Sequence, residues 1–373
     1  MKIYESHRRS VHNEGWATEP APRSQGAGAL FLVALVLIGA FVLVILHMPA
    51  LMKDGSDLIL RLASSVAGAA GISPTKDLNY SIYSPLIQNG VANISYPSDY
   101  GALSTYVLSL VNSDRANYGL GAVTLSNNKV GQQHADSMLR YGYFSHNDTQ
   151  GFKPYMRYSL LGGTGAVDEN IAYIYSGFPT YTSTASVEGA LRSLEYSMMY
   201  KDSQCCSNGH RNNTLSALHN RISVGVAYNG TTVYFVEDFE NYCINLNFSV
   251  SSSYYVTMTG TPVEEGLSAN AVYVTYDRTP SPETTAQLDS GPHKYGPGSP
   301  LGGVLPPCYF ACRAFEQGIT VYADKWTFAP NLVFVTFSLR DFVQHCGAGV
   351  YTVYMITGAD TSSAITSISI FVS

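Results

Sequence analysis

Charged residues are scarce in this chain, and no stretch of it is strongly basic. Asp, Glu, Lys and Arg make up 13% of the 373 residues, against about 25% in ordinary globular domains, and the net charge is −6. Because a nucleic-acid-binding surface needs clustered Lys and Arg, we expect no nucleic-acid partner. Apolar residues make up 46% of the chain, which excludes a wholly disordered protein.

Two sequence motifs of hydrolases are missing as well. The sequence contains no His-Glu-x-x-His run, which would place two metal ligands and a base on one helix face. It also contains no Gly-x-Ser-x-Gly turn, the usual setting of a serine nucleophile. These absences favour a binding protein over an enzyme.

One apolar run is long enough to cross a membrane. Ala27–Leu46 holds twenty residues without a charge, and a helix of that length spans a hydrocarbon core of about 30 Å. A cleaved signal peptide is the alternative, but its apolar region is usually ~7–15 residues long. The flanking basic residues are Lys2, Arg8, Arg9 and Arg23 before the run, and Lys53 and Arg61 after it. We therefore predict a single-pass anchor in the cell membrane at 27–47, with a cytoplasmic tail (1–26) and extracellular domains after it.

All six cysteines follow the apolar run, where disulfides persist in an extracellular setting. They are Cys205, Cys206, Cys243, Cys308, Cys312 and Cys346. We expect disulfide bonds, and we do not expect the neighbours Cys205 and Cys206 to pair with each other. With three cysteines in each half of the exterior, each half keeps a free thiol or shares a bridge with the other. A zinc site of Cys308, Cys312, His345 and Cys346 is the alternative.

The exterior divides into three parts. Residues 48–100 are predicted to be a stalk or linker, in which Pro74, Pro85 and Pro97 interrupt regular structure. Residues 101–247 mix helical periodicity, for example in 103–111 and 185–200, with two strands around Asn229-Gly230, a strong hairpin signal.

Residues 250–373 are predicted to form an all-β, sandwich-like module. Its predicted strands are Tyr254–Thr259, Ala271–Tyr276, Leu332–Leu339, Gly349–Ile356 and Ile365–Val372. The connection Pro280–Pro307 holds seven prolines and five glycines. We predict that it is structureless, either as a functional loop or as a disordered segment.

Five segments in order resemble the CAP superfamily, the group of cysteine-rich secretory, antigen and pathogenesis-related proteins with an SCP-like extracellular domain. They are LVNSDR (110–115), QHADSM with GYFSH (133–138 and 142–146), ENIA (169–172), GHRNNTL (209–215), and VGVAY with YFVEDF (224–228 and 234–239). The resemblance implies an α/β fold, a three-layer α-β-α sandwich with a central cleft. It says nothing of residues 250–373.

The resemblance also implies a set of cleft residues, namely His146, Glu169, Glu195 and His210. Imidazole and carboxylate groups suit Zn²⁺ or another divalent metal, which makes zinc the candidate cofactor. A purely structural role for Glu169 is the alternative, in which its carboxylate accepts backbone N–H groups. His134, on the inward face of the helix before GYFSH, is expected to pack in the core.

Three functions are compatible with these features. The favoured one is a membrane-anchored, exoplasmic CAP protein whose His/Glu cleft binds a surface ligand, a lipid or a protein partner and catalyses no defined reaction. The alternative is a divalent-metal-dependent hydrolase or peptidase, in which two histidines hold the ion and Glu169 or Glu195 is the general base. In the third, the CAP domain is a scaffold and the β module carries recognition.

Overall fold

The computed structural model describes residues 2–8, 80–85, 94–358 and 360–373. The predicted membrane anchor at 27–47 lies outside the described residues, as do most of the predicted tail and of the predicted stalk. Within the part that is described, no helix combines the length and the apolar composition that crossing a bilayer requires.

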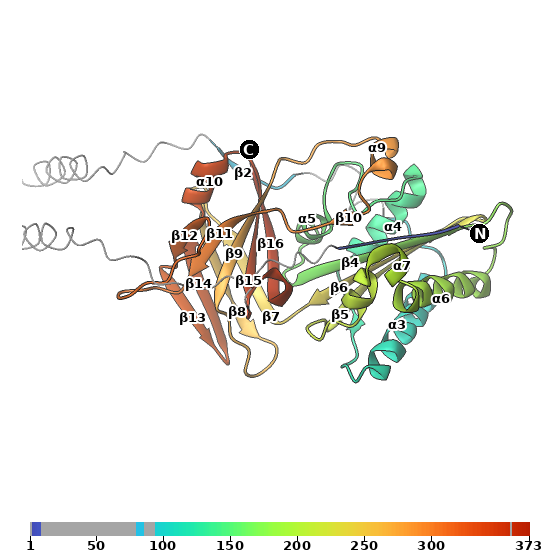
Figure 1. The fold of residues 1–373 in the computed structure, drawn as a ribbon, viewed down its shortest axis with the longest axis horizontal. Helices are drawn as coiled ribbons and strands as arrows, with labels where there is room; N and C mark the ends of the chain where they lie inside the picture. The colour runs from blue at the N-terminus through green and yellow to red at the C-terminus, as the bar shows by residue number, and fades with distance from the viewer. Residues whose placement is uncertain (1, 9–79, 86–93, 359) are drawn as a thin grey trace, which may run out of the picture. The chain divides into compact units, whose positions relative to one another are not determined.

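The region with mixed signals is built on a six-stranded sheet of order β10-β1-β4-β6-β5-β3 (Figure 1). Its strands are β1 (Lys2–Arg8), β3 (Thr124–Leu125), β4 (Ala166–Tyr175), β5 (Arg221–Tyr228), β6 (Thr232–Asn241) and β10 (Lys294–Tyr295). The β5–β6 hairpin turns at Asn229-Gly230, as predicted. Asn229 Oδ1 accepts the backbone N–H groups of Thr231 and Thr232, each at 2.9 Å, and thereby holds the turn.

Helices cover both faces of this sheet, in an α-β-α arrangement (Figure 1). On one face lie α3 (Tyr100–Asn117) and α6 (Thr184–Tyr200), and on the other lie α4 (Val130–Tyr141) and α5 (Pro154–Leu160). Side chains alternate along β4, so Ile171 joins the apolar cluster beneath α4 while its neighbour Ala172 joins the cluster beneath α3 and α6.

Helix α4 approaches β5 unusually closely, because glycines face each other there. A Cβ atom on Gly225 would lie 2.0 Å from the carbonyl oxygen of Gly131. The side chain of Gln132 bonds both backbone groups of Val226, at 2.9 and 3.0 Å. The loop that follows α4, which carries His146, therefore starts from a firmly docked helix.

The C-terminal region forms two further sheets, β12-β11-β9-β15-β16-β2 and β13-β14-β8-β7. The first contains β2 (Ile82–Tyr83), β9 (Ala271–Asp277), β11 (Ser299–Leu305), β12 (Ile319–Tyr322), β15 (Gly349–Ile356) and β16 (Ala364–Val372). The second contains β7 (Ile244–Val250), β8 (Tyr255–Pro262), β13 (Lys325–Ala329) and β14 (Leu332–Ser338). The short helix α10 (Arg340–Cys346) and the 3₁₀ turn η2 (Thr361–Ser363) complete the region. Strand β7 crosses the predicted boundary at 247–250.

The proline- and glycine-rich connection is ordered, so the prediction of a structureless segment is wrong. It contains α9 (Thr285–Ser290), β10 and β11. We call residues 279–298 the strap. Leu288 of the strap is buried in the cluster beneath α4, and Asp289 Oδ1 accepts the Phe144 N–H at 2.8 Å. These contacts to the first sheet's helical layer supply the order that the composition alone does not predict.

The disulfides differ from the expectation at one point. Cys205 pairs with its neighbour Cys206, at the end of the short helix α7 (Ser203–Cys206), so the prediction that these two do not pair is wrong. The other bridge joins Cys308 to Cys312. Among the six cysteines, all of which are described, Cys243 and Cys346 are free thiols, one in each half of the exterior. The four residues of the alternative zinc site are therefore not all available as ligands.

Strand β1 lies where the sequence did not place it. Its residues Lys2–Ser6 pair antiparallel with β4, and His7 and Arg8 pair in parallel with β10. A strand in this sheet and a cytoplasmic tail are mutually exclusive locations for residues 2–8 when residues 27–46 span a membrane.

Candidate functional site

The four predicted cleft residues come from four different elements. His146 lies in the loop after α4, Glu169 in β4, Glu195 in α6, and His210 in α8 (Gly209–Thr214). All four are buried, with at most 2% of each exposed to solvent. Charged and polar groups at this depth need partners, and those partners decide what the site can do.

Glu169 is the centre of a network of hydrogen bonds and ion pairs. Its Oε1 lies 2.8 Å from Nδ1 of His146, and its Oε2 accepts from Nη2 of Arg157 at 2.7 Å. Burial alone would raise the pKa of Glu169, but Arg157 and two nearby histidines outweigh it and lower the pKa to about 2. The carboxylate is therefore charged and already engaged through both oxygens.

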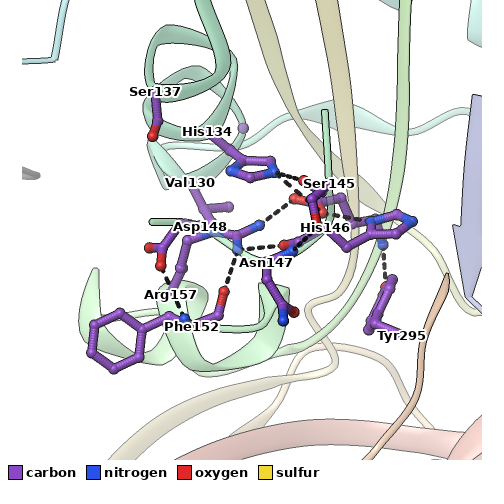
Figure 2. A network of polar contacts seen from close by, with 12 residues as sticks. Val130, His134, Ser137, Ser145, His146, Asn147, Asp148, Phe152, Arg157 and Tyr295 are labelled. Atoms are coloured by element: carbon purple, nitrogen blue, oxygen red, sulfur yellow. Dashed lines mark hydrogen bonds and ion pairs between the residues drawn. The ribbon is translucent and has the colours of Figure 1, made fainter. Parts of the chain in front are cut away.

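Arg157 also shapes the loop that presents His146. Its Nη1 donates to the carbonyl oxygens of His146 and Phe152, each at 2.7 Å (Figure 2). Asp148 closes the same loop, because its Oδ1 accepts the N–H groups of Gln150 and Phe152 at 2.9 Å. One guanidinium thus fixes both the carboxylate and the backbone that carries the imidazole.

His146 keeps one nitrogen that could act as a ligand. Burial lowers the pKa of His146, so the imidazole is neutral at pH 7. With Nδ1 on Glu169, the other nitrogen, Nε2, is buried and has no hydrogen-bond partner among the described residues. The ring packs against Tyr295 of the strap, with 4.6 Å between ring centroids.

His210 has a different carboxylate partner. Its Nδ1 lies 2.6 Å from Oδ1 of Asp202, a buried residue just before α7. Asp202, Cys205, Cys206 and His210 have potential ligand atoms within 4.8 Å of one another. Two of these four are the sulfurs of the Cys205–Cys206 disulfide, which are not thiolate ligands.

Glu195 belongs to a separate acidic pair with Glu237 of β6. Burial raises the pKa of Glu195 well above its usual range, and the neighbouring Glu237 raises it further. Burial also raises the pKa of Glu237, to about 7. The side-chain amide of Asn170 donates to Glu237 Oε2 at 3.2 Å. Burial and Glu237 therefore favour the protonated form of Glu195, whereas Arg157 favours the charged form of Glu169.

The register of β4 on β6 explains why the two glutamates differ. Glu169 pairs with Asp238, and Asn170 pairs with Glu237. Adjacent residues of a strand point to opposite faces, so Glu169 lies on the α4 and α5 face and Glu237 on the α3 and α6 face. The four predicted residues have different first partners: His146 contacts Glu169, Glu195 faces Glu237, and His210 contacts Asp202. His210 is also close enough to His146 and Glu237 to shift their pKa values.

These partners limit what a divalent metal could use. The two imidazoles fit a zinc ion, because each has its Nδ1 oriented by a carboxylate, as metal-bound histidines commonly do. The two predicted glutamates fit less well, since Glu169 is held by Arg157 and the raised pKa of Glu195 disfavours its charged form. Its low pKa and its two engaged oxygens make Glu169 a poor general base at pH 7.

Several site residues were missed from the sequence: Arg157, Asp202, Glu237, Asp238 and Tyr295. Glu237 and Asp238 had a usable signal, because they and Glu240 place three acids in a strand that is buried along nearly its whole length. Tyr295 had none. It lies 126 residues from Glu169, whose backbone N–H donates to its hydroxyl at 2.6 Å.

Comparison with known protein families identifies one domain of the chain. The model of the CAP family, described as the cysteine-rich secretory protein family, matches residues 108–239. The chain contains a CAP domain. The match runs from within α3 to within β6 and includes all four predicted cleft residues.

A comparison with solved structures matches this chain to the CAP domain of enterococcal PrgA. It has 15% sequence identity to this chain, and the alignment covers 51% of this chain and 80% of that one with a TM-score of 0.30. A likeness at that score supports no argument about the function of this CAP domain. A search of curated proteins found no match.

Proposed function

We propose that this chain is a membrane-anchored, exoplasmic CAP protein that binds a ligand or a partner at its His/Glu network and catalyses no defined reaction. The observation that carries the proposal is the state of Glu169, whose two oxygens are committed to His146 and Arg157 at 2.8 and 2.7 Å. A carboxylate held in this way fixes the positions of His146 and Arg157, and it accepts a proton poorly.

The test is a cleavage screen of the full chain, purified in a lipid bilayer and supplied with Zn²⁺. A broad peptide library is incubated with the protein and analysed by mass spectrometry, beside a His146→Ala/His210→Ala variant. We expect no cleavage. Cleavage that is lost in the double variant would establish the hydrolase alternative. The observation that favours this alternative is the unpartnered Nε2 of His146, which is free to bind a metal ion.

The anchor and its orientation are part of the proposal and rest on the uncharged run Ala27–Leu46 and its flanking basic residues. Protease treatment of intact cells that express the chain with an epitope tag at each end tests both. We expect the C-terminal tag to be cleaved and the N-terminal tag to be protected. Cleavage of both tags would contradict the proposed cytoplasmic location of the N-terminal tail.

A contribution of the β region to recognition is favoured by one further observation. The loop closed by Cys308–Cys312 exposes Tyr309 (85%) and Phe310 (92%). Beside it lies a cavity of about 700 Å³, lined in part by Tyr273, Arg313 and Phe315. Binding of cells or vesicles by the wild type, compared with a Tyr309→Ser/Phe310→Ser variant, measures this contribution. Equal binding would assign recognition to the CAP domain alone.

A further inference from the structure

The sheet of the CAP domain contains a place for one strand between β4 and β10. In the structure this place is filled by Lys2–Arg8, the strand β1. Five residue pairs join β1 to β4, from Lys2 with Tyr175 to Ser6 with Ile171. Two more pairs, His7 with Lys294 and Arg8 with Tyr295, join it to the strap. We call the space between β4 and β10 the strand slot.

The strand slot needs an occupant for a physical reason. The edge of β4 that faces away from β6 presents backbone N–H and C=O groups, and seven of the ten residues of β4 are buried when β1 is in place. Unpaired backbone groups at such a site are costly, which is why buried sheet edges are paired or covered. Helices α7 and α8 also lie against β1, so the slot is a lined groove and not an open edge.

The slot leads directly to the His/Glu network. Beyond Ser6, the next residues of β4 toward its beginning are Asn170 and Glu169. There the backbone N–H of Glu169 donates to the Tyr295 hydroxyl, so β4 is tied to the strap where β1 changes partners. Tyr295 packs on His146, and α8 carries His210. A strand in the slot therefore passes beside the residues that the proposed function assigns to binding.

We infer that the strand slot is the peptide-binding site of this CAP domain, and that its ligand is an extended segment of another polypeptide chain that pairs through its main chain with β4 and β10. The inference deepens the proposed function and rests on it. With residues 27–46 across a membrane, Lys2–Arg8 would stay on the cytoplasmic side, and the slot outside the cell would be open to a different strand.

The pairing defines the chemistry of the ligand. Strand β1 uses seven residues, so an extended segment of about that length fits. Alternate residues of an antiparallel strand direct their N–H groups to the same neighbour, so proline or an N-methylated residue is excluded at one set of alternate positions and tolerated better at the other. Binding of this kind depends on the backbone first and on side chains second.

The experiment uses the full chain in lipid nanodiscs and a fluorescent peptide with the sequence of residues 1–9. Two modified peptides carry N-methyl groups, one at Ile3 and Glu5 and the other at Tyr4 and Ser6. We expect the unmodified peptide to bind and one modified peptide to bind about tenfold more weakly or worse than the other, because only one set of amides faces β4. Hydrogen exchange at 170–175 should slow when the unmodified peptide binds.

Two chain variants identify the source of the natural occupant. Glu5→Pro disrupts β1, and Asn13→Pro is the matched control beyond its end. Equal binding by the wild type and both variants supports a ligand from another chain. If the peptide binds to the Glu5→Pro variant but not to the wild type or Asn13→Pro, the chain's own N-terminus fills the slot. This result would overturn the inference that the ligand comes from another chain.

Two other results would overturn the slot itself: no binding by any form of the protein, or equal binding of all three peptides. The location of the N-terminus is read independently by the tag-cleavage assay. A failure of the membrane orientation is therefore distinguishable from a failure of the slot.

Discussion

Two buried glutamates on opposite faces of the central sheet have pKa values shifted in opposite directions. Glu169, toward α4 and α5, and Glu237, toward α3 and α6, are both fully buried. Arg157 overcomes the effect of burial at Glu169 and brings its pKa to about 2, whereas burial brings the pKa of Glu237 to about 7. Depth in the fold is the same, so the neighbouring charge decides which carboxyl is ionised.

The largest effect should come from removing the cation. Arg157→Met leaves Glu169 buried without its counter-charge and removes the bonds to the His146 and Phe152 carbonyls. We expect the free energy of unfolding to fall by about 3–5 kcal/mol at pH 7, measured by urea denaturation. The exposed Arg192→Met is the control and should cost less than ~1 kcal/mol.

The double variant Arg157→Met/Glu169→Gln separates charge from packing. Because neither charge is left uncompensated, it should recover part of the loss seen in Arg157→Met. A double variant as unstable as Arg157→Met would mean that the loop bonds matter, not the ion pair.

The dependence of stability on pH should next separate Glu169 from Glu237. The pKa of Glu237 is raised, so the unfolded chain loses this proton first and stability falls as pH rises from about 4.5 to about 7. Glu237→Gln should remove that fall and gain on the order of 3 kcal/mol relative to wild type across this range. Urea midpoints measured between pH 4 and 8 test it.

Glu169→Gln is the matched comparison and should behave in the opposite sense. The pKa of Glu169 is lowered, so its stabilisation is present above about pH 4.5 and is lost as pH falls toward 2. The difference between wild type and Glu169→Gln should therefore shrink in acid. Parallel pH profiles for the two glutamine variants would contradict the assigned charge states.

The smallest effect is expected for Glu195→Gln measured at pH 4. Burial and Glu237 raise the pKa of Glu195 well above its usual range, and glutamine has nearly the same size and polarity as the protonated carboxyl. At pH 4, where this carboxyl is protonated in the folded chain and largely protonated in the unfolded chain, we expect a change in unfolding free energy of less than ~1 kcal/mol. As pH rises toward 7, the variant should gain stability relative to wild type, as Glu237→Gln does. A loss of stability at pH 7 would show that Glu195 is ionised in the folded chain.

Local patterns predicted the CAP domain well, because its elements are short-range features. Apolar spacing located α3 and α6, and Asn229-Gly230 located the β5–β6 turn. The same reasoning failed for the strap. Its prolines and glycines predict neither a helix nor a strand. The order of the strap comes from long-range contacts, such as that of Leu288 beneath α4.

The candidate site was predicted residue by residue but not as an arrangement. The resemblance named the two histidines and two glutamates, while their partners Arg157, Asp202 and Glu237 depend on strand register and helix docking. The Cys205–Cys206 bridge depends on the local backbone at the end of α7. Spacing along the chain contains none of this information.

Helix α5 has a mechanical consequence, because it is bonded to both regions of the molecule. Its Tyr155 donates to Asp277 of β9 at 2.7 Å, and its Ser159 accepts the N–H of Ser369 in β16 at 3.0 Å. Arg157, between these two residues, holds Glu169 at 2.7 Å. Tension applied to the C-terminal strands would therefore be transmitted within one helical turn to the guanidinium that keeps His146 in place.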